Sequence, residues 1–186
     1  MKVTREQAEA NRERILDNAG RLFRERGFDG IGLNDLMQAA GLTRGGFYGH
    51  FESKDDLAAH ATRQALASHH EAWRARSDRS LADWVEAYLS DAHRDGRGEG
   101  CGLAALAGDV ARSGPPVQAA FAQGVRSIVA ALQPQMPADD AERQREQALA
   151  TLSTLVGALV LSRAVGDDAL SRELRDAARQ QLPLTG

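Results

Sequence analysis

Residues 41–57, with the sequence GLTRGGFYGHFESKDDL, combine hydrogen-bond donors with closely spaced glycines. Arg44 carries a planar guanidinium that can donate two parallel hydrogen bonds to O6 and N7 of a guanine. The hydroxyls of Thr43 and Tyr48 and the ammonium of Lys54 can bind phosphate oxygens. The glycines between them remove side chains where another molecule's backbone must come close. This stretch therefore has the chemistry of a nucleic-acid contact.

Two helices must position this stretch. The first is predicted to start at a capping box on Thr4 and to end at Gly27, with one apolar stripe along its length. A second, short helix is predicted over residues 33–40, and Gly41 can adopt the left-handed conformation that ends it. The order helix, glycine turn, helix is typical of the helix-turn-helix, which places its second helix in the major groove of DNA.

The helix predicted over residues 44–51 would not form in isolation. Thr43 can cap it, but it contains three glycines, each of which costs about 1 kcal/mol relative to alanine. We therefore expect Phe47 and Phe51 to hold it by packing against the first two helices. A structural helical hairpin without a DNA role is the alternative interpretation of the same residues.

The remaining sequence predicts a second helical body. No stretch shows the period-two alternation of a strand, so the chain is expected to be all-α, with a head of residues 1–52 and a body of residues 53–186. Further helices are predicted over residues 53–76, 80–89, 103–112, 117–132, 138–165 and 168–181, with a glycine-rich loop over residues 96–102.

Composition limits the function classes. The net charge is −3, and residues 1–55 contain nine basic and nine acidic residues, which excludes a protein that coats nucleic acid through charge alone. The single cysteine, Cys101, excludes an intrachain disulfide and a multi-thiolate metal site. With one cysteine, the chain is expected in a reducing cytoplasm. The polar N-terminus predicts no signal peptide, and the short, Thr-containing apolar run of residues 148–162 predicts no membrane span.

Residues 12–57 resemble the TetR/AcrR family of bacterial transcriptional regulators in order and spacing. The resemblance implies about nine helices: a three-helix DNA-binding head and a body that binds an effector and dimerises. It implies a homodimer on a palindromic operator, most often a repressor that a small-molecule or thiol-reactive effector releases, and it implies neither enzymatic activity nor a cofactor. The implied DNA contacts are Thr43, Arg44, Gly45, Gly46, Tyr48, His50 and Lys54.

One position departs from the family pattern. Gly32 stands where the second helix commonly begins with Ser or Thr, so both a helix cap and a phosphate contact are weakened there. The resemblance also implies that the last two helices form the dimer interface. The apolar residues that suit it are Leu152, Leu155, Val156, Leu159, Leu170 and Leu174.

The body offers candidates for an effector pocket. They are the aromatic residues Trp73, Trp84, Tyr88 and Phe121, together with Cys101, although most aromatics at helical spacing are simply core. Trp84 and Tyr88 lie one turn apart on one face, which favours these two. Cys101 precedes a predicted helix and lies near Arg97, and both features favour a reactive thiolate. Some regulators of this family sense oxidants or electrophiles through such a thiol, and the segment GCGLAALAGDVAR is similar to that of related members. A small buried residue is the alternative.

Other functions find little support. The histidines form no coherent metal-ligand set, so no metal site is predicted. The sequence has no paired carboxylates with a histidine at Glu-x-x-His spacing, and Cys101 is the only candidate nucleophile for an enzyme. The neutral head and Gly32 leave open a helical dimer that binds a partner protein without DNA.

Overall fold

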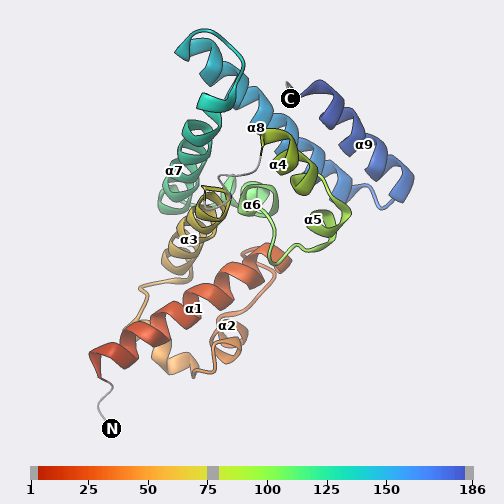
Figure 1. Ribbon diagram of the computed structural model, residues 1–186. Coiled ribbons are helices and arrows are strands. Elements are labelled where there is room, and N and C mark those ends of the chain that lie inside the picture. Colours follow the sequence, from red (N-terminus) through yellow and green to blue (C-terminus); the bar gives the residue numbers. More distant parts are fainter. Residues whose placement is uncertain (1–3, 75–79, 183–186) are drawn as a thin grey trace.

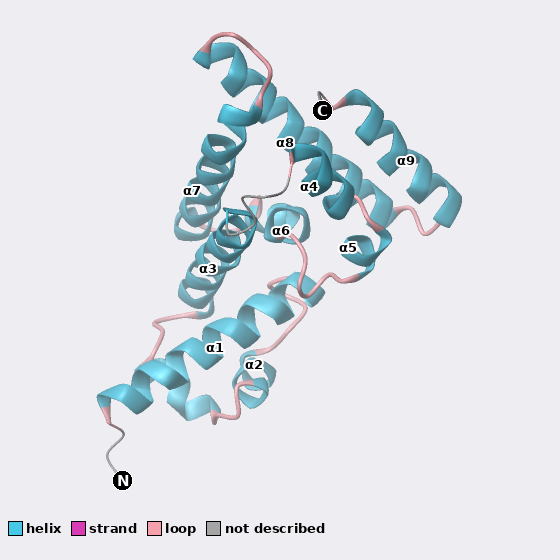
Figure 2. Cartoon of the chain, in the orientation of Figure 1, coloured by secondary structure: helices cyan, strands magenta, loops and turns pink. Residues whose placement is uncertain are grey.

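The computed structural model describes residues 4–74 and 80–182, with side chains from 4 to 67 and from 80 to 182. Every regular element in these ranges is a helix (Figure 2). The elements are α1 (Arg5–Arg26), α2 (Leu33–Ala39), the 3-10 helix η1 (Arg44–Gly49), α3 (Lys54–Arg74), α4 (Leu81–Tyr88), α5 (Asp91–Asp95), α6 (Gly102–Val110), α7 (Pro115–Leu132), the 3-10 helix η2 (Gln133–Gln135), α8 (Ala141–Ala164) and α9 (Asp168–Gln181).

The helices form a head and a body. Figure 1 shows α1 and α2 at the N-terminal end of the molecule and α8 and α9 at the other end. Between them, α3 packs closely against α1 and along α7, so it belongs to both parts. The all-α fold and the N-terminal helix-turn-helix arrangement are thus confirmed.

The predicted start of α1 and the predicted ends of α1 and α2 are present in the head. Thr4 caps α1 by accepting a hydrogen bond from the backbone N–H of Gln7 at 3.2 Å. Gly27 ends α1 with φ of +75°, and Gly41 follows α2 with φ of +70°. Only glycine adopts this region without steric cost, so both turns depend on their residue type.

Two apolar clusters make up the core. The first joins α1, α2, η1 and the start of α3, and it continues into the body through Leu106 and Val110 of α6 and Val117 of α7. The second lies among α3, α4 and α6 to α9 and includes Tyr88 and Cys101. The predicted domain boundary at residue 52 remains a prediction, and the first cluster extends across it.

The link between α6 and the head is polar as well as apolar. The backbone N–H of Phe28 donates to Oδ2 of Asp109 at 3.2 Å. A Cβ atom on Gly27 would stand 2.6 Å from the same oxygen, so the glycine is required here by close approach and by its φ angle. Asp109 also pairs with the exposed Arg112 at 2.7 Å.

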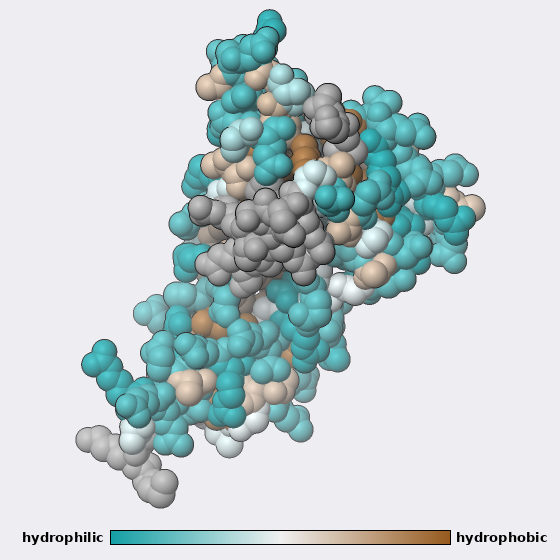
Figure 3. Space-filling model, in the orientation of Figure 1, coloured by the Kyte–Doolittle hydropathy of each residue, from teal (hydrophilic) through white to brown (hydrophobic). Residues whose placement is uncertain are grey.

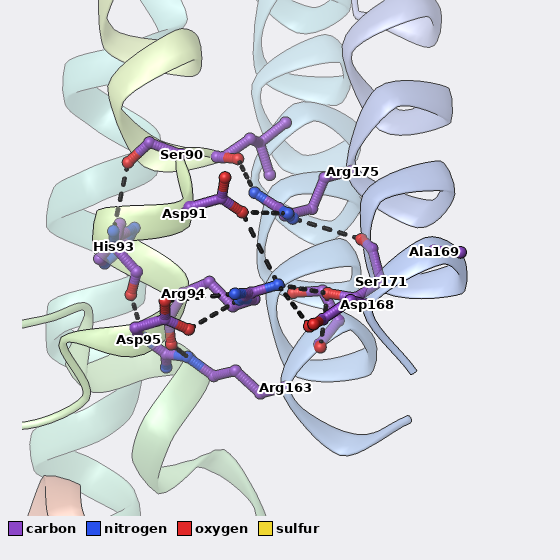
Figure 4. Close-up of polar contacts among 12 residues, drawn as sticks. Ser90, Asp91, His93, Arg94, Asp95, Arg163, Asp168, Ala169, Ser171 and Arg175 are labelled. Atoms are coloured by element: carbon purple, nitrogen blue, oxygen red, sulfur yellow. Dashed lines mark hydrogen bonds and ion pairs between the residues drawn. The ribbon is translucent and has the colours of Figure 1, made fainter. Parts of the chain in front are cut away.

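An arginine network attaches α5 to α8 and α9 (Figure 4). The side chain of Arg175 is only 3% exposed, and it donates to the carbonyl of Leu89 at 2.8 Å and to Asp91 at 2.6 Å. Arg94 pairs with Asp95 at 2.7 Å, and Arg163 donates to the Arg94 carbonyl at 2.9 Å. The bonds of Arg175 and Arg163 join residues about 70 to 90 positions apart in the chain. Helix α5 is one that the sequence pattern did not predict.

The apolar run of residues 148–162 lies inside the longer helix α8. By length and composition alone α8 could cross a membrane, a property that core helices of globular proteins share. Within the subunit, one face of α8 packs into the second cluster, and Leu149, Val160 and Leu161 are exposed.

Candidate functional site

The predicted contact stretch is held at the surface of the head by one aromatic anchor. Phe47 is 0% exposed and packs in the first cluster. Its ring lies 5.3 Å from that of Tyr48, edge to face, and 5.8 Å from that of Phe51. The expected role of Phe47 and Phe51 as packing residues is confirmed, and the segment forms a 3-10 helix of six residues rather than the predicted eight-residue helix.

The opposite side of η1 presents the predicted contact residues to solvent. Tyr48 is 66% exposed, an unusual position for a large aromatic side chain. Arg44 is also exposed, and Lys54 is half-buried at the first position of α3. Within the described part of the chain, neither cation forms a salt bridge. Thr43, Gly45 and Gly46 are exposed and His50 is half-buried on the same segment.

The glycines of η1 are not explained by the packing of the subunit. A Cβ atom on Gly45 or Gly49 would meet no heavy atom within 4 Å, and neither residue has positive φ. On Gly46 it would meet only the end of Met37 at 3.9 Å. Each glycine lowers helix stability, and packing within the subunit does not account for this cost. The open, glycine-lined surface therefore favours close approach by another molecule.

The residues before η1, α3 and α2 differ in whether they cap the helix that follows. Ser53 caps α3, since its hydroxyl accepts from the N–H of Asp56 at 3.0 Å, and this cap fixes Lys54 at the helix start. Thr43 was expected to cap the third helix, and this is wrong: its side chain makes no capping hydrogen bond. The tighter 3-10 turn leaves the hydroxyl without that role. Gly32 likewise provides no side-chain cap for α2.

Arg12 of α1 packs against Phe51, which follows η1. Its guanidinium lies over the ring of Phe51, 5.1 Å from the centroid, and one nitrogen is 3.3 Å from Nδ1 of His60. Burial and the positive charge of Arg12 lower the pKa of His60, and Asp56 opposes this shift. His60 therefore adds little positive charge to the head at neutral pH. Figure 3 shows that the N-terminal end of the molecule is mostly hydrophilic on the face drawn.

Comparison with known proteins identifies this head. Residues 15–61 match the family model described as bacterial regulatory proteins, tetR family. This part of the chain is therefore similar to bacterial regulators of the TetR family. The transcriptional regulator AcrR of Shigella flexneri is 44% identical over 54 residues, which cover 29% of this chain and 25% of AcrR. The repressor NemR of Escherichia coli is 27% identical over 128 residues, 65% of this chain and 64% of NemR. The matches thus span less than two thirds of these relatives' lengths.

Solved structures extend the likeness of fold beyond the TetR head. The crystal structure of reduced E. coli NemR superposes with a TM-score of 0.75 at 21% identity, over 93% of this chain and 95% of that one. A TetR-family regulator from Agrobacterium tumefaciens gives a TM-score of 0.75 at 18% identity, over 94% of this chain and 98% of that one. The helical body therefore has the fold of TetR-family members.

The predicted effector residues lie in or beside the second cluster. Tyr88 and Cys101 are buried within it, and Trp84 and Phe121 pack against it. The rings of Trp84 and Tyr88 are 5.3 Å apart, as their spacing predicted. Burial raises the pKa of the Tyr88 hydroxyl well above its ordinary value, and the neighbouring Cys101 adds to the rise. The side chain of Trp73 lies outside the described residues.

Cys101 is the N-cap residue of α6 and is 5% exposed. Its backbone N–H donates to Nε2 of His93 at 2.9 Å, and Nδ1 of His93 is 2.6 Å from the carbonyl of Tyr88. These bonds require the His93 proton on Nδ1. The cations in electrostatic contact with Cys101 are Arg24 and Arg163, whose pKa values are lowered chiefly by burial.

The prediction that Arg97 assists the thiol is replaced by this geometry. Arg97 is exposed, and its guanidinium donates to the backbone carbonyl of Arg163 at 3.4 Å. Sequence proximity suggested Arg97, whereas the folded chain brings Arg24 from α1 and Arg163 from α8 to the same place. The packing of three distant segments could not be read from local spacing.

Three of the predicted interface residues are not available to a second subunit. Leu152, Leu155 and Leu159 are buried inside the second cluster of their own subunit, so their assignment to the dimer interface is wrong. Val156 and Leu174 are half-buried and Leu170 is exposed, and these three stay candidates. The apolar residues on the exposed side of α8 are Leu149, Val160 and Leu161, which were not among the predicted interface residues.

Proposed function

We propose that this protein is a DNA-binding transcriptional regulator that acts as a homodimeric repressor. The observation that carries the proposal is the η1 surface, where Tyr48 and Arg44 are exposed beside glycines that the subunit itself does not require. The names of the relatives AcrR and NemR, a transcriptional regulator and a transcriptional repressor, support it. Operator DNA places its action in the cytoplasm of a bacterial cell.

DNA binding is expected to depend on a few positioned groups. The N-terminal head is electrically neutral overall, so non-specific attraction to DNA is weak. Arg44 is assigned to a base edge or phosphate, and Thr43, Tyr48, His50 and Lys54 are assigned to phosphates. Gly45 and Gly46 allow the backbone of η1 to approach the DNA.

The test is fluorescence anisotropy with palindromic fragments from the region upstream of the protein's own gene. Replacing Arg44 with alanine is expected to weaken specific binding by about 1–3 kcal/mol. Arg126→Ala, which removes an exposed arginine of α7, serves as the matched control and should bind as the unchanged protein does. Equal affinity of both variants, or no sequence-selective binding at all, would contradict the proposal.

Release from the operator is assigned to an effector bound in the body near Trp84, Tyr88 and Phe121. Successive major grooves on one face of DNA are about 34 Å apart, and the two heads of a dimer must match this spacing. An effector that binds more tightly to dimers whose heads are too far apart shifts the population of dimers away from the DNA-binding form. The candidate dimer surface is the exposed side of α8 together with α9. Gly157 lies on it, where a Cβ atom would meet nothing within 4 Å of the subunit.

A thiol-reactive effector acting on Cys101 is the finer form of this proposal. Since the thiol is nearly buried, reaction requires an opening of the loop of residues 96–101. Alkylation with N-ethylmaleimide should lower operator affinity of the unchanged protein and leave that of Cys101→Ser unaltered. An unchanged effector response in Cys101→Ser would exclude thiol sensing while leaving DNA binding in place.

A further inference from the structure

A polar cleft of about 520 Å³ lies between the head and the body, away from the aromatic residues assigned to the effector. Helix α1, helix α3 and the loop before α6 form its walls. The floor is apolar and comprises Leu16, Ala61 and Ala65, and the rim carries Asp17, Arg21, Arg24 and Glu99. Its volume is within the range of small-molecule sites in proteins.

The walls of the cleft are fixed by the fold. Nε2 of Gln64 donates to Asp17 at 2.6 Å, which joins α3 to α1 at the rim. The loop presses against α1, because a Cβ atom on Gly98 would stand 2.4 Å from an oxygen of Glu25. The loop carbonyl of Gly98 accepts a hydrogen bond from Nε of Arg24 at 2.6 Å. The cleft is therefore pre-formed.

Arg24 is an incompletely paired cation. Arg24 is half-buried, so its guanidinium is partly removed from water. This burial lowers its pKa, and the negative charge of Glu99 opposes the shift. Among the described residues no carboxylate lies within salt-bridge distance of Arg24. The bond to Gly98 uses Nε and leaves both terminal nitrogens for another acceptor. A partly dehydrated guanidinium favours a carboxylate that can accept two parallel hydrogen bonds.

The other charged groups restrict the ligand further. Arg21 is already paired with Glu25 at 3.0 Å. Glu99 is exposed and makes neither a salt bridge nor a hydrogen bond within the described part of the chain. The four charged rim residues sum to zero, two acidic and two basic. A ligand that matches this rim carries both an anionic and a cationic group.

We propose that this cleft binds a small zwitterion, an α-amino acid with a compact apolar side chain. Its carboxylate pairs with Arg24, its ammonium group faces Glu99, and its side chain covers the apolar floor near Ala61 and Ala65. The proposal does not depend on DNA binding, and it is measured on the full chain without DNA.

Three isosteric probes test the charges, namely L-valine, L-valinamide, which lacks the carboxylate, and 3-methylbutanoate, which lacks the ammonium group. Binding is followed by titration of the backbone amide resonances of Gly20 and Gly98. L-valine is expected to bind with a dissociation constant on the order of 1 mM or below. Each of the other two should bind about tenfold more weakly or not at all. No binding of L-valine, or equal binding of either analogue, would overturn the proposal.

Two variants locate the site. Arg24→Gln should weaken L-valine binding about tenfold or more, and Arg143→Gln on α8 should not. Gly20→Ala covers the case in which Arg24→Gln does not fold, because alanine favours the helix and its Cβ atom would stand 3.5 Å from Arg24, inside the cleft. Gly20→Ala should raise the melting temperature and weaken binding, whereas Gly108→Ala on α6 should leave binding intact. Unaltered binding in Gly20→Ala would refute the assignment.

Discussion

Asp109 provides a quantitative test of how the body holds the head. This α6 carboxylate accepts the backbone N–H of Phe28, directly after the turn that ends α1. Phe28 is itself buried, so its N–H has little access to water as a replacement partner. Replacing Asp109 with alanine removes the acceptor, whereas asparagine retains a neutral one at the same position.

The expected magnitudes follow from the environment of each bond. A hydrogen bond to a charged group contributes about 1.5–3 kcal/mol, and a neutral one contributes roughly half as much. The ion pair with Arg112 adds about 0–1 kcal/mol, because the Arg112 side chain is 73% exposed. We therefore expect the free energy of unfolding to fall by about 2–3 kcal/mol in Asp109→Ala and by about 1 kcal/mol in Asp109→Asn.

Urea unfolding followed by circular dichroism measures these values, and Arg112→Gln is the control. The control removes the ion pair and leaves the bond to Phe28, so its loss should stay below about 1 kcal/mol. Asp109→Ala should also lower the melting temperature by about 4–10 °C. If Asp109→Ala and Arg112→Gln were equally stable, the bond between Asp109 and Phe28 would contribute nothing and the reasoning would fail.

Three further predictions address the head, the turns and α5. Phe47→Ala should lower the free energy of unfolding by about 3–5 kcal/mol. Tyr48→Ala, at an exposed position, should reduce DNA affinity with little loss of stability. Comparable losses of stability of the two variants in urea unfolding would contradict the packing described for η1. Gly41→Ala should cost about 1–2 kcal/mol because φ is +70°. Gly108→Ala, where the added Cβ atom would meet only the end of the Arg112 side chain at 3.9 Å, should gain about 0.5–1 kcal/mol. Thermal unfolding can check both values. The hydrogen bond from Arg175 lowers the pKa of Asp91. Asp91 therefore contributes stability above its unfolded pKa of about 4, and this stability is lost as pH falls through the lower folded pKa. Asp91→Asn should remove this part of the acid dependence of stability, and an unchanged dependence of stability on pH would contradict the prediction.

The sequence predicted elements well where local chemistry determines them. Ser80 and Asp83 form the capping box of α4, with Asp83 N–H to Ser80 at 3.2 Å. The glycine stops at Gly27 and Gly41 and the buried anchor Phe47 were also found. In each case the deciding interaction involves residues within a few positions along the chain, or a backbone conformation that glycine alone tolerates.

Features that depend on distant segments were missed. Helix α5 has five residues and is attached through Arg175 of α9 and Arg163 of α8, partners that no local pattern reveals. The assignment of Leu152, Leu155 and Leu159 to the dimer interface failed for a related reason. Apolar residues occur on more than one side of α8, and periodicity cannot tell which side faces the same subunit and which faces a second copy.

Three helices connect the apolar clusters and thereby define how the body can influence the head. One of them, α7, contributes Val117 to the first cluster and Val129 to the second. Helix α3 contributes Leu57 to the first cluster and Leu66 to the second. Helix α6 contributes Leu106 to the first cluster, whereas its N-cap residue Cys101 lies in the second, about 8 Å away at 1.5 Å per residue. Because packed helices shift as rigid units rather than deform, we expect a change near Cys101 to displace the head through α6 as well. Loss of the bond between Asp109 and Phe28 should then weaken the effector response more than it weakens operator binding.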